Sequence, residues 1–178
     1  MTMSTTAAVK ALLTVVLLAA ALPAGARIAN QASVEELARA SDAVVRGRVV
    51  NVSARRSSDG KRISTYAEVE TDSVWRGSAP ARLTVVVRGG VVGDIGEKVF
   101  GAPTFSQGEE VVVFLGRTDG SFYRVRGLAQ GKFSVANGKA RPDLSGLTFP
   151  EGSALRAGEH RAEAMSVGEL EQRVRAAR

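Results

Sequence analysis

The sequence predicts a mainly β protein whose strands form a small antiparallel barrel or a sandwich. Runs of β-branched residues and period-two alternation recur between residues 43 and 135. Turn signals such as Asn137-Gly138 separate these runs. No helical pattern lies between successive strands, as a parallel α/β sheet would require, so an antiparallel arrangement is favoured. One short helix is expected before the strands and one after them.

The first helix is expected at the start of the folded part. Ser33 and Glu36 have the spacing of a capping box, in which the serine hydroxyl accepts from the Glu36 amide and the Glu36 carboxylate accepts from the Ser33 amide. Small apolar residues at helical spacing give this helix one side that can pack on a core. These residues are Val34, Leu37, Ala38 and Ala40. The polar pair Ser41-Asp42 is expected to end the helix.

The first two strands are expected to form a hairpin. Valines dominate residues 43–52, and Gly47 among them indicates a bend or a β-bulge. The polar residues 57–60 have the composition of a turn between antiparallel strands. Residues 63–72 then alternate between largely apolar and largely polar side chains, which indicates a strand with one solvent-exposed face. This second strand is closed by Trp75, Arg76 and Gly77.

Four further strands are expected in the middle of the chain. They span residues 83–87, 110–115, 122–125 and 131–135, each bounded by residues that favour turns. A glycine-rich passage at residues 89–101 separates the first two of them. We expect this passage to be an irregular loop, and loops on a rigid scaffold often carry binding residues.

The C-terminal part is expected to differ from the barrel. Residues 141–163 are rich in Gly, Pro, Ser and charged side chains, as in an extended loop. Ser166 and Glu169 again have capping-box spacing and predict a short closing helix. Its apolar side would consist of Val167, Leu170 and Val174. This helix can dock on its own core or on a neighbouring molecule.

Residues 1–26 have the three parts of a cleavable secretory signal peptide. Lys10 supplies the positive n-region, residues 11–22 form an apolar stretch interrupted only by a threonine, and residues 24–26 form a small-x-small cleavage site. The apolar stretch is shorter than the ~20 residues that a membrane-spanning helix needs, so an uncleaved anchor is disfavoured. We expect cleavage after Ala26 and a secreted or periplasmic protein with no stable membrane anchor.

A single folded domain is expected after the leader. The chain has 178 residues, enough for one hydrophobic core and too few for a second domain. The expected organisation is a signal peptide at residues 1–26, a β-barrel domain at 27–140, and a polar loop with a C-terminal helix at 141–178. Cysteine is absent, which excludes disulfides, a thiolate nucleophile and cysteine-ligated metals. Apolar packing must therefore stabilise the fold.

The chain is basic, with a formal net charge of +6 at pH 7. Lys10 is the only charged side chain of the leader, so nearly all of this excess belongs to the part after it. A positive protein attracts polyanions such as nucleic acid, lipopolysaccharide and anionic lipid headgroups. The arginines are scattered rather than clustered, which favours a solvated surface over a dedicated polyanion site.

Four stretches of the chain carry a resemblance to known proteins. They are residues 40–50, residues 69–77, which end in Trp-Arg-Gly, residues 108–115 and residues 131–133. Through them the chain resembles the small OB-like barrels of exported bacterial proteins, and it is distantly similar to the netrin-like module of tissue inhibitors of metalloproteinases. The resemblance implies an OB-like barrel. It does not imply inhibition, because those inhibitors chelate the protease metal through an N-terminal cysteine, which this chain lacks.

No pattern in the sequence indicates a catalytic residue, a metal site or a cofactor. His160 is the only histidine, and no Gly-x-Ser-x-Gly motif accompanies it, which indicates a solvated side chain. Residues 90–96 are glycine-rich, but no helix pattern follows, as a phosphate-binding loop would require. Glu68, Glu70 and Asp72 share a strand face, where they either bind a cation or form the solvent-exposed side.

The function favoured by the sequence is a non-catalytic, exported or envelope-associated binding module that contacts an unidentified protein or an anionic surface polymer. A polyanion-binding or nucleic-acid-binding barrel is one alternative, although the low aromatic content of 5% disfavours nucleic acid. An enzyme with a carboxylate site in residues 89–105 is another. The candidate binding residues are Tyr66, Arg88, Asp94, Glu97, Tyr123, Arg124 and Arg126.

Overall fold

The computed structural model describes residues 32–118, 120–142, 144, 147 and 164–178. The predicted signal peptide, most of the predicted polar loop and His160 lie outside the described residues. The elements in chain order are α2 (Val34–Arg39), β1 (Ala43–Arg56), β2 (Ile63–Gly77), β3 (Arg82–Arg88), β4 (Gly90–Val92), β5 (Ile95–Glu97), β6 (Glu110–Arg117), β7 (Phe122–Val125), the 3₁₀ helix η1 (Leu128–Gly131), β8 (Lys132–Ala136), β9 (Lys139–Pro142), β10 (Met165–Ser166) and α3 (Val167–Ala176). Within these residues, no helix has the length and apolar character needed to cross a membrane.

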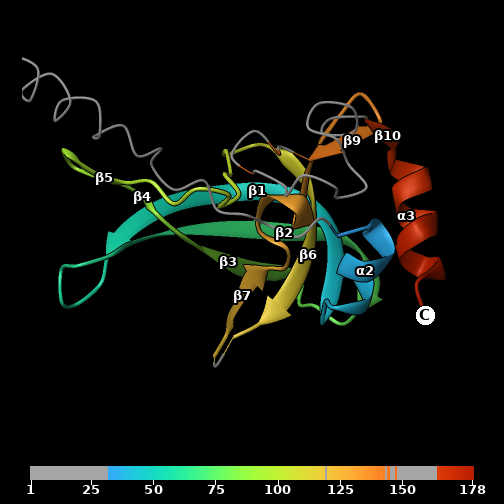
Figure 1. The fold of residues 1–178 in the computed structure, drawn as a ribbon, viewed down its shortest axis with the longest axis horizontal. Coiled ribbons are helices and arrows are strands. Elements are labelled where there is room, and N and C mark those ends of the chain that lie inside the picture. Colours follow the sequence, from blue (N-terminus) through green and yellow to red (C-terminus); the bar gives the residue numbers. More distant parts are fainter. Residues whose placement is uncertain (1–31, 119, 143, 145–146, 148–163) are drawn as a thin grey trace, which may run out of the picture.

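Five strands close into a barrel, which confirms the predicted mainly β class (Figure 1). Hydrogen bonding follows the order β1-β2-β3-β7-β6, and β6 pairs back to β1. The pair β3 and β7 is parallel, with Thr84 opposite Phe122, so the barrel is mixed rather than purely antiparallel. An odd number of strands cannot alternate in direction all the way round a closed barrel. One parallel pair is therefore required.

The local signals of residues 33–77, which come first in the described part of the chain, are confirmed. Glu36 N donates to Ser33 Oγ at 3.2 Å and Ser33 N donates to Glu36 Oε2 at 2.8 Å, so the capping box is complete. The Ser33 amide and hydroxyl both donate to the Glu36 carboxylate, which holds the pKa of Glu36 below its usual range.

β1 and β2 form the expected hairpin, with a register shift between Arg46 and Gly47. A Cβ at Gly47 would lie 2.2 Å from the carbonyl oxygen of Glu70, so the bulge requires glycine.

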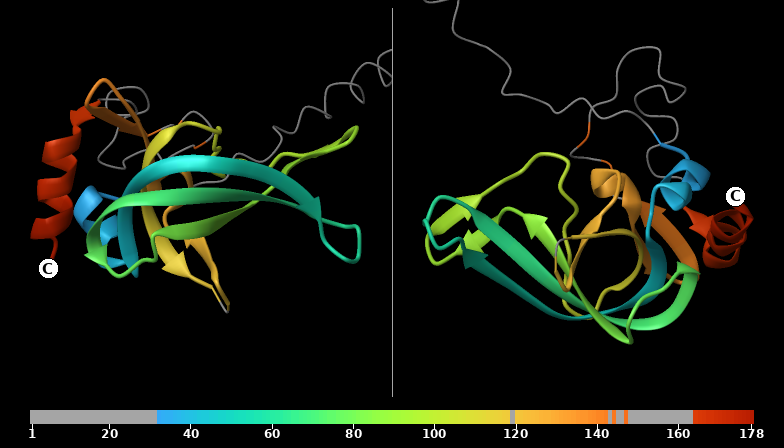
Figure 2. Two further views of the ribbon diagram at one scale, coloured as in Figure 1. Left: turned by 180° about the vertical axis from the view of Figure 1, so that it is seen from behind. Right: turned by 90° about the horizontal axis from the view of Figure 1, so that it is seen from below.

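Side chains of β1 alternate between two hydrophobic cores. Val45 points into the barrel and packs in one cluster with Val85 of β3 and Val113 of β6. Val44 points outward and belongs to a second cluster with Phe114, beneath α2 and α3. The helices therefore cover the outer side of β1 and β6 (Figure 2). They leave the outer side of β3, β7 and the N-terminal half of β2 uncovered.

The C-terminal helix docks on the protein's own core. Ser166 Oγ accepts from Glu169 N at 3.1 Å, which caps α3 as the sequence predicts. Leu170 is fully buried against the outward core. Arg76 Nη1 of β2 donates to the carbonyl oxygen of Ala177 at 2.7 Å, which fixes the end of the helix. Of the two docking modes left open by the sequence, the structure has the intramolecular one.

The glycine-rich passage contains a hairpin that its sequence was not expected to form. β4 and β5 pair antiparallel across the two-residue turn Gly93-Asp94. Gly93 has φ of 59°, and glycine at positive φ in the first turn position is the requirement of the type II′ hairpin turn. We call residues 90–97 the arm. It projects from the same end of the molecule as the turn between β1 and β2 (Figure 1).

Candidate functional site

The outward side of β2, β3 and β7 forms one surface that neither helix covers. Tyr66 lies opposite Ser53 and Val86, and Phe122 lies opposite Thr84. Residues that are paired directly point to the same side of a sheet, and the alternate positions of these strands are buried in the barrel. We call this surface the Tyr66 face. It comprises Ser53, Arg55, Ser64, Tyr66, Thr84, Val86, Arg88, Phe122 and Arg124.

Two aromatic rings and one guanidinium group meet at the centre of the Tyr66 face. The rings of Tyr66 and Phe122 pack edge to face, with centroids 5.7 Å apart and an interplanar angle of 67°. Arg55 Cζ lies 5.2 Å from the centroid of the Tyr66 ring, within the range of a cation–π contact. Phe122 keeps 42% of its surface exposed, and Arg55 is exposed. The cluster therefore offers apolar surface and positive charge side by side.

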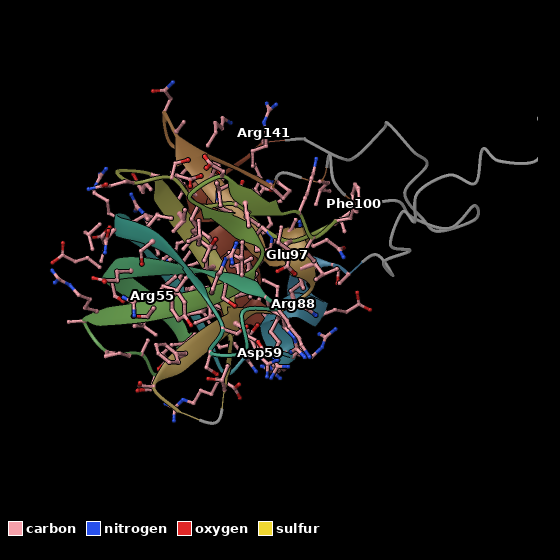
Figure 3. The ribbon with its side chains drawn as sticks, turned by 90° about the vertical axis from the view of Figure 1, so that its left-hand side faces the viewer. Arg55, Asp59, Arg88, Glu97, Phe100 and Arg141 are labelled. Carbon is pink, nitrogen blue, oxygen red and sulfur yellow. The ribbon has the colours of Figure 1, made fainter. Side chains whose placement is uncertain are left out.

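Positive charge gathers where the Tyr66 face meets the turn between β1 and β2, the end from which Figure 3 is viewed. Arg55 and Arg88 lie on the face itself, and further cations follow in the hairpin. These further cations are Arg56, Lys61 and Arg62. The one acid of this turn, Asp59, accepts from Ser57 Oγ at 2.5 Å and from Lys61 N at 3.1 Å. The hydroxyl bond from Ser57 is the main reason that the pKa of Asp59 lies below its usual range.

Acidic side chains lie at the other end of the outward side of β2 and already have partners. Glu68 Oε1 accepts from Asn51 Nδ2 at 3.2 Å, and Glu70 Oε1 lies 3.7 Å from Arg82 Nη2. No set of three or more His, Asp or Glu side chains in the described part of the chain is placed to hold a metal ion. These carboxylates therefore form the solvent-exposed side of the strand.

Three of the candidate residues lie together on the Tyr66 face, and two others point elsewhere. Tyr66, Arg88 and Arg124 are on this face. Tyr123 is only 7% exposed and packs inside the barrel. Arg126 crosses the surface of Gly116 and pairs with Asp42, with Nη2···Oδ2 of 3.4 Å.

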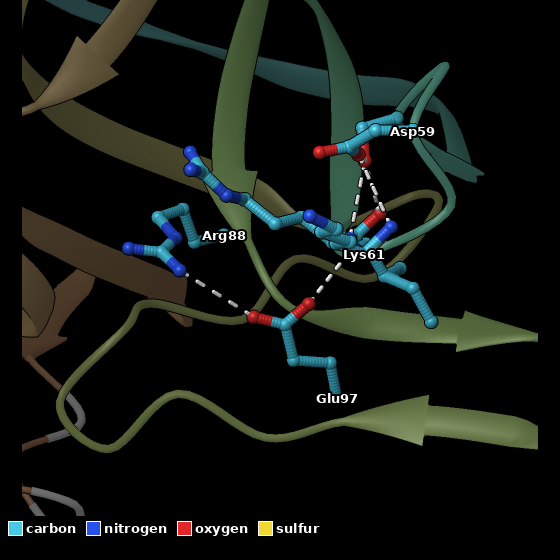
Figure 4. Close-up of polar contacts among 7 residues, drawn as sticks. Asp59, Lys61, Arg88 and Glu97 are labelled. Atoms are coloured by element: carbon cyan, nitrogen blue, oxygen red, sulfur yellow. Dashed lines mark hydrogen bonds and ion pairs between the residues drawn. The ribbon is translucent and has the colours of Figure 1, made fainter.

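The remaining two candidates, Asp94 and Glu97, lie at opposite ends of the arm. Asp94 is exposed at the apex. Glu97 lies at the base, where one carboxylate oxygen accepts from Ile63 N at 2.6 Å and the other lies 3.6 Å from Arg88 Nη2 (Figure 4). The structure thus does not bring the two carboxylates into one site. Glu97 instead fixes the base of the arm to the start of β2.

Phe122 and Arg55 are the two members of the central cluster that sequence reasoning missed. The signal for Phe122 was present, because residues two apart on a strand share a face and Phe122 is two residues from Arg124. By the same alternation, Tyr123 had to point away from Arg124. Arg55 carried no comparable signal, since its contact with Tyr66 depends on the register of the β1–β2 hairpin.

A buried polar cluster joins β8 to the segment before β6. Lys132 is only 4% exposed, and its ammonium group contacts the carboxylate of Glu109 and donates to Ser134 Oγ at 2.9 Å. Ser134 Oγ donates in turn to Glu109 Oε1 at 2.5 Å, and the Phe105 ring lies 5.4 Å from Lys132 Nζ. Each polar group satisfies another, and the two charges neutralise each other. The arrangement anchors the segment to β8.

Comparisons of the chain with protein-family models, with curated proteins and with solved structures found no match. They identify no family for the chain. Of the resemblance to OB-like proteins, the structure supports the small β-barrel fold.

Proposed function

We propose that this protein is an exported, non-catalytic binding module that recognises an anionic surface polymer through the Tyr66 face. The observation that carries the proposal is the contact of Tyr66 with both Phe122 and Arg55 on a side of the barrel that neither α2 nor α3 covers. Aromatic rings can stack on sugar rings or bases, and arginine pairs with sulfate, phosphate or carboxylate groups. The combination suits a flexible polymer that carries both rings and anionic groups.

The position of this cluster within the barrel supports the proposal. OB-folds bind oligosaccharides and oligonucleotides on the face of their second and third strands, flanked by the loops after the first and fourth. The Tyr66 face lies on the second and third barrel strands, β2 and β3. The basic turn at residues 57–62 follows the first strand, and residues 118–121 follow the fourth, β6.

The alternative of an enzyme with a carboxylate site in residues 89–105 has less support. General acid–base chemistry by two carboxylates requires both to reach one substrate. Asp94 lies at the apex of the arm, while Glu97 lies at its base and accepts from Ile63 N.

Export is proposed on the strength of the signal-peptide pattern. The N-terminal sequence of the secreted product should begin at Arg27.

The binding proposal is tested by fluorescence anisotropy with labelled heparin as the anionic polymer, on the protein from Arg27 onward. We expect Phe122→Ala to weaken binding by about 1–3 kcal/mol, the usual contribution of a stacking ring. Arg55→Gln should weaken binding and lower its salt dependence. Arg175→Gln serves as the control, because Arg175 is an exposed arginine on α3, away from the Tyr66 face.

Four outcomes are distinguished by this experiment. Selective loss in the two Tyr66-face variants supports the proposal. Equal loss in all three variants would show a non-specific charge effect and overturn it, as would the absence of heparin binding. Tighter binding of an oligothymidylate than of heparin, with the same pattern among the variants, would replace the surface polymer by single-stranded nucleic acid.

A further inference from the structure

The arm exposes apolar side chains to an unusual degree for its size. Val91 is 68% exposed and Ile95 is 53% exposed, the two highest values among the large apolar residues that the structure describes as exposed. Both lie within two residues of the apex turn Gly93-Asp94. Single exposed apolar residues are common on proteins, but two on a projecting hairpin indicate a surface that is covered in use.

The two side chains lie on opposite faces of the arm. Ile95 is paired with Val92, so these two residues share one face. Val91 is paired with Gly96 and points to the other face. A groove on a folded partner would have to enclose both faces of the hairpin to cover both side chains. A fluid lipid interface surrounds an inserted apex from every side without such a groove.

The surroundings of the arm are positively charged. The β1–β2 turn projects from the same end of the molecule (Figures 1 and 2) and carries Lys61 and Arg62, while Lys98 follows the arm directly. Asp59 and Glu97 are engaged within the protein, since Asp59 accepts from Ser57 and Lys61 and Glu97 accepts from Ile63, whereas Asp94 is exposed at the apex. This end therefore presents cations beside the exposed apolar side chains of the arm, which is complementary to anionic headgroups over a hydrocarbon layer.

The base of the arm is fixed to the barrel rather than hinged. Thr65 Oγ1 donates to the carbonyl oxygen of Gly89 at 2.8 Å, and Glu97 bonds to Ile63 N at 2.6 Å (Figure 4). A Cβ at Gly90 would lie 2.5 Å from Thr65 Oγ1, so the chain leaves β3 in close contact with β2. The arm and the basic turn thus keep a constant relation to each other.

We propose that this end of the molecule docks reversibly onto an anionic lipid surface, with Val91 and Ile95 entering the interface and the cations of the adjoining turn contacting headgroups. Asp94 at the apex limits the depth of insertion, because its carboxylate stays in the headgroup layer. The basic turn borders both surfaces, but the apolar side chains of the arm, Val91 and Ile95, are not part of the Tyr66 face, so the proposal does not depend on polymer binding.

The test is co-sedimentation of the protein from Arg27 onward with two kinds of vesicle, phosphatidylcholine alone and phosphatidylcholine mixed with phosphatidylglycerol. We expect binding to the anionic vesicles only. The double variant Val91→Ser with Ile95→Ser should bind about tenfold more weakly, since it removes most of the apolar surface of the apex. Lys61→Gln with Arg62→Gln should also bind about tenfold more weakly, because each cation near the surface contributes to binding. Asp94→Asn should bind more tightly than the unchanged protein.

Phe122→Ser is the matched control, because Phe122 is an exposed apolar residue on the Tyr66 face. It should weaken heparin binding and keep vesicle binding, so failure of one proposal can be told from failure of the other. Vesicle binding that the Val91 and Ile95 substitutions leave unchanged would overturn the lipid proposal. So would equal binding to neutral vesicles, or no binding to either kind, which would leave a protein partner as the occupant of the arm. Unchanged circular dichroism of each variant guards against loss of the fold.

Discussion

The guanidinium group of Arg173 donates to both carboxylate oxygens of Glu35, with Nε···Oε1 of 2.7 Å and Nη2···Oε2 of 3.0 Å. This bidentate pair joins α3 to α2, near the two ends of the continuous part of the chain that the structure describes. The hydrogen bonds from Arg173 hold the pKa of Glu35 below its usual range. The two helices are thereby held together over the outer side of β1 and β6, and the Tyr66 face stays free of them.

Breaking this pair should weaken the fold slightly. Both side chains are about one-third exposed, so solvent screening keeps the contribution of the pair near the value for surface ion pairs. We expect Arg173→Gln to lower the free energy of unfolding by about 0.5–1 kcal/mol in urea denaturation. The control is Glu171→Gln, which breaks the exposed pair with Arg175 on the same helix and should cost about 0.3–0.5 kcal/mol. A larger loss in the control would contradict this ranking.

The same pair predicts a pH dependence of stability. Because the folded-state pKa of Glu35 is lowered, its ionised form stabilises the fold above the unfolded-chain pKa of about 4.3. This contribution is lost as the pH falls through the lowered folded-state pKa. Urea titrations of the unchanged protein and of Glu35→Gln should therefore differ by a constant amount above about pH 5 and converge as the pH falls through the lowered folded-state pKa. A difference that persists unchanged into strong acid would refute the assignment.

Leu170 should be essential for docking of α3. Its side chain is fully buried between α3 and the outward core of the barrel. We expect Leu170→Ala to destabilise the protein by about 2–5 kcal/mol, through lost burial and the cavity left behind. Gln172→Ala, at an exposed position of the same helix, should change stability by less than about 0.5 kcal/mol. Thermal unfolding followed by circular dichroism compares the two, and equal melting temperatures would mean that α3 contributes little to the fold.

Gly47→Ala should disrupt the bulge in β1. The added methyl group would lie 2.2 Å from the Glu70 carbonyl oxygen and 2.9 Å from Val69 Cγ1, so the backbone of β2 would have to move. We expect a loss of about 1–3 kcal/mol, the usual cost of overpacking a core. Gly168→Ala is the control, because nothing lies within 4 Å of its added methyl group and alanine favours a helix. It should leave the melting temperature unchanged or raise it, and an equal loss at both positions would argue against the bulge geometry.

The elements that short-range patterns determine were predicted well. The Ser33–Glu36 capping box depends on residues three apart, and the β1–β2 hairpin depends on a polar turn between adjacent strands. Gly47 was identified as a bend or bulge from its position among valines. In each case the signal consists of residues that lie close together in the sequence, and these residues determine the local backbone geometry.

The elements that depend on distant pairing were not predicted. The parallel pair between Thr84 and Phe122 links strands that the sequence separates, and no periodicity reports which strands become neighbours. The central cluster was only partly foreseen for the same reason, because Arg55 reaches Tyr66 through hairpin register. The arm is different, since the Gly93-Asp94 pair between apolar residues is a hairpin signal. Its strands are only three residues long, which is too short for alternation to be seen.

Mapping of the polymer by amide chemical shifts tests the central claim most directly. On titration of the ¹⁵N-labelled protein with a short heparin oligosaccharide, we predict the largest shift changes at Tyr66, Phe122 and Arg55, with α2 and α3 unchanged. Shift changes confined to α2, α3 or β9, or a spectrum that stays constant at saturating oligosaccharide, would contradict the assignment of the Tyr66 face as the binding surface.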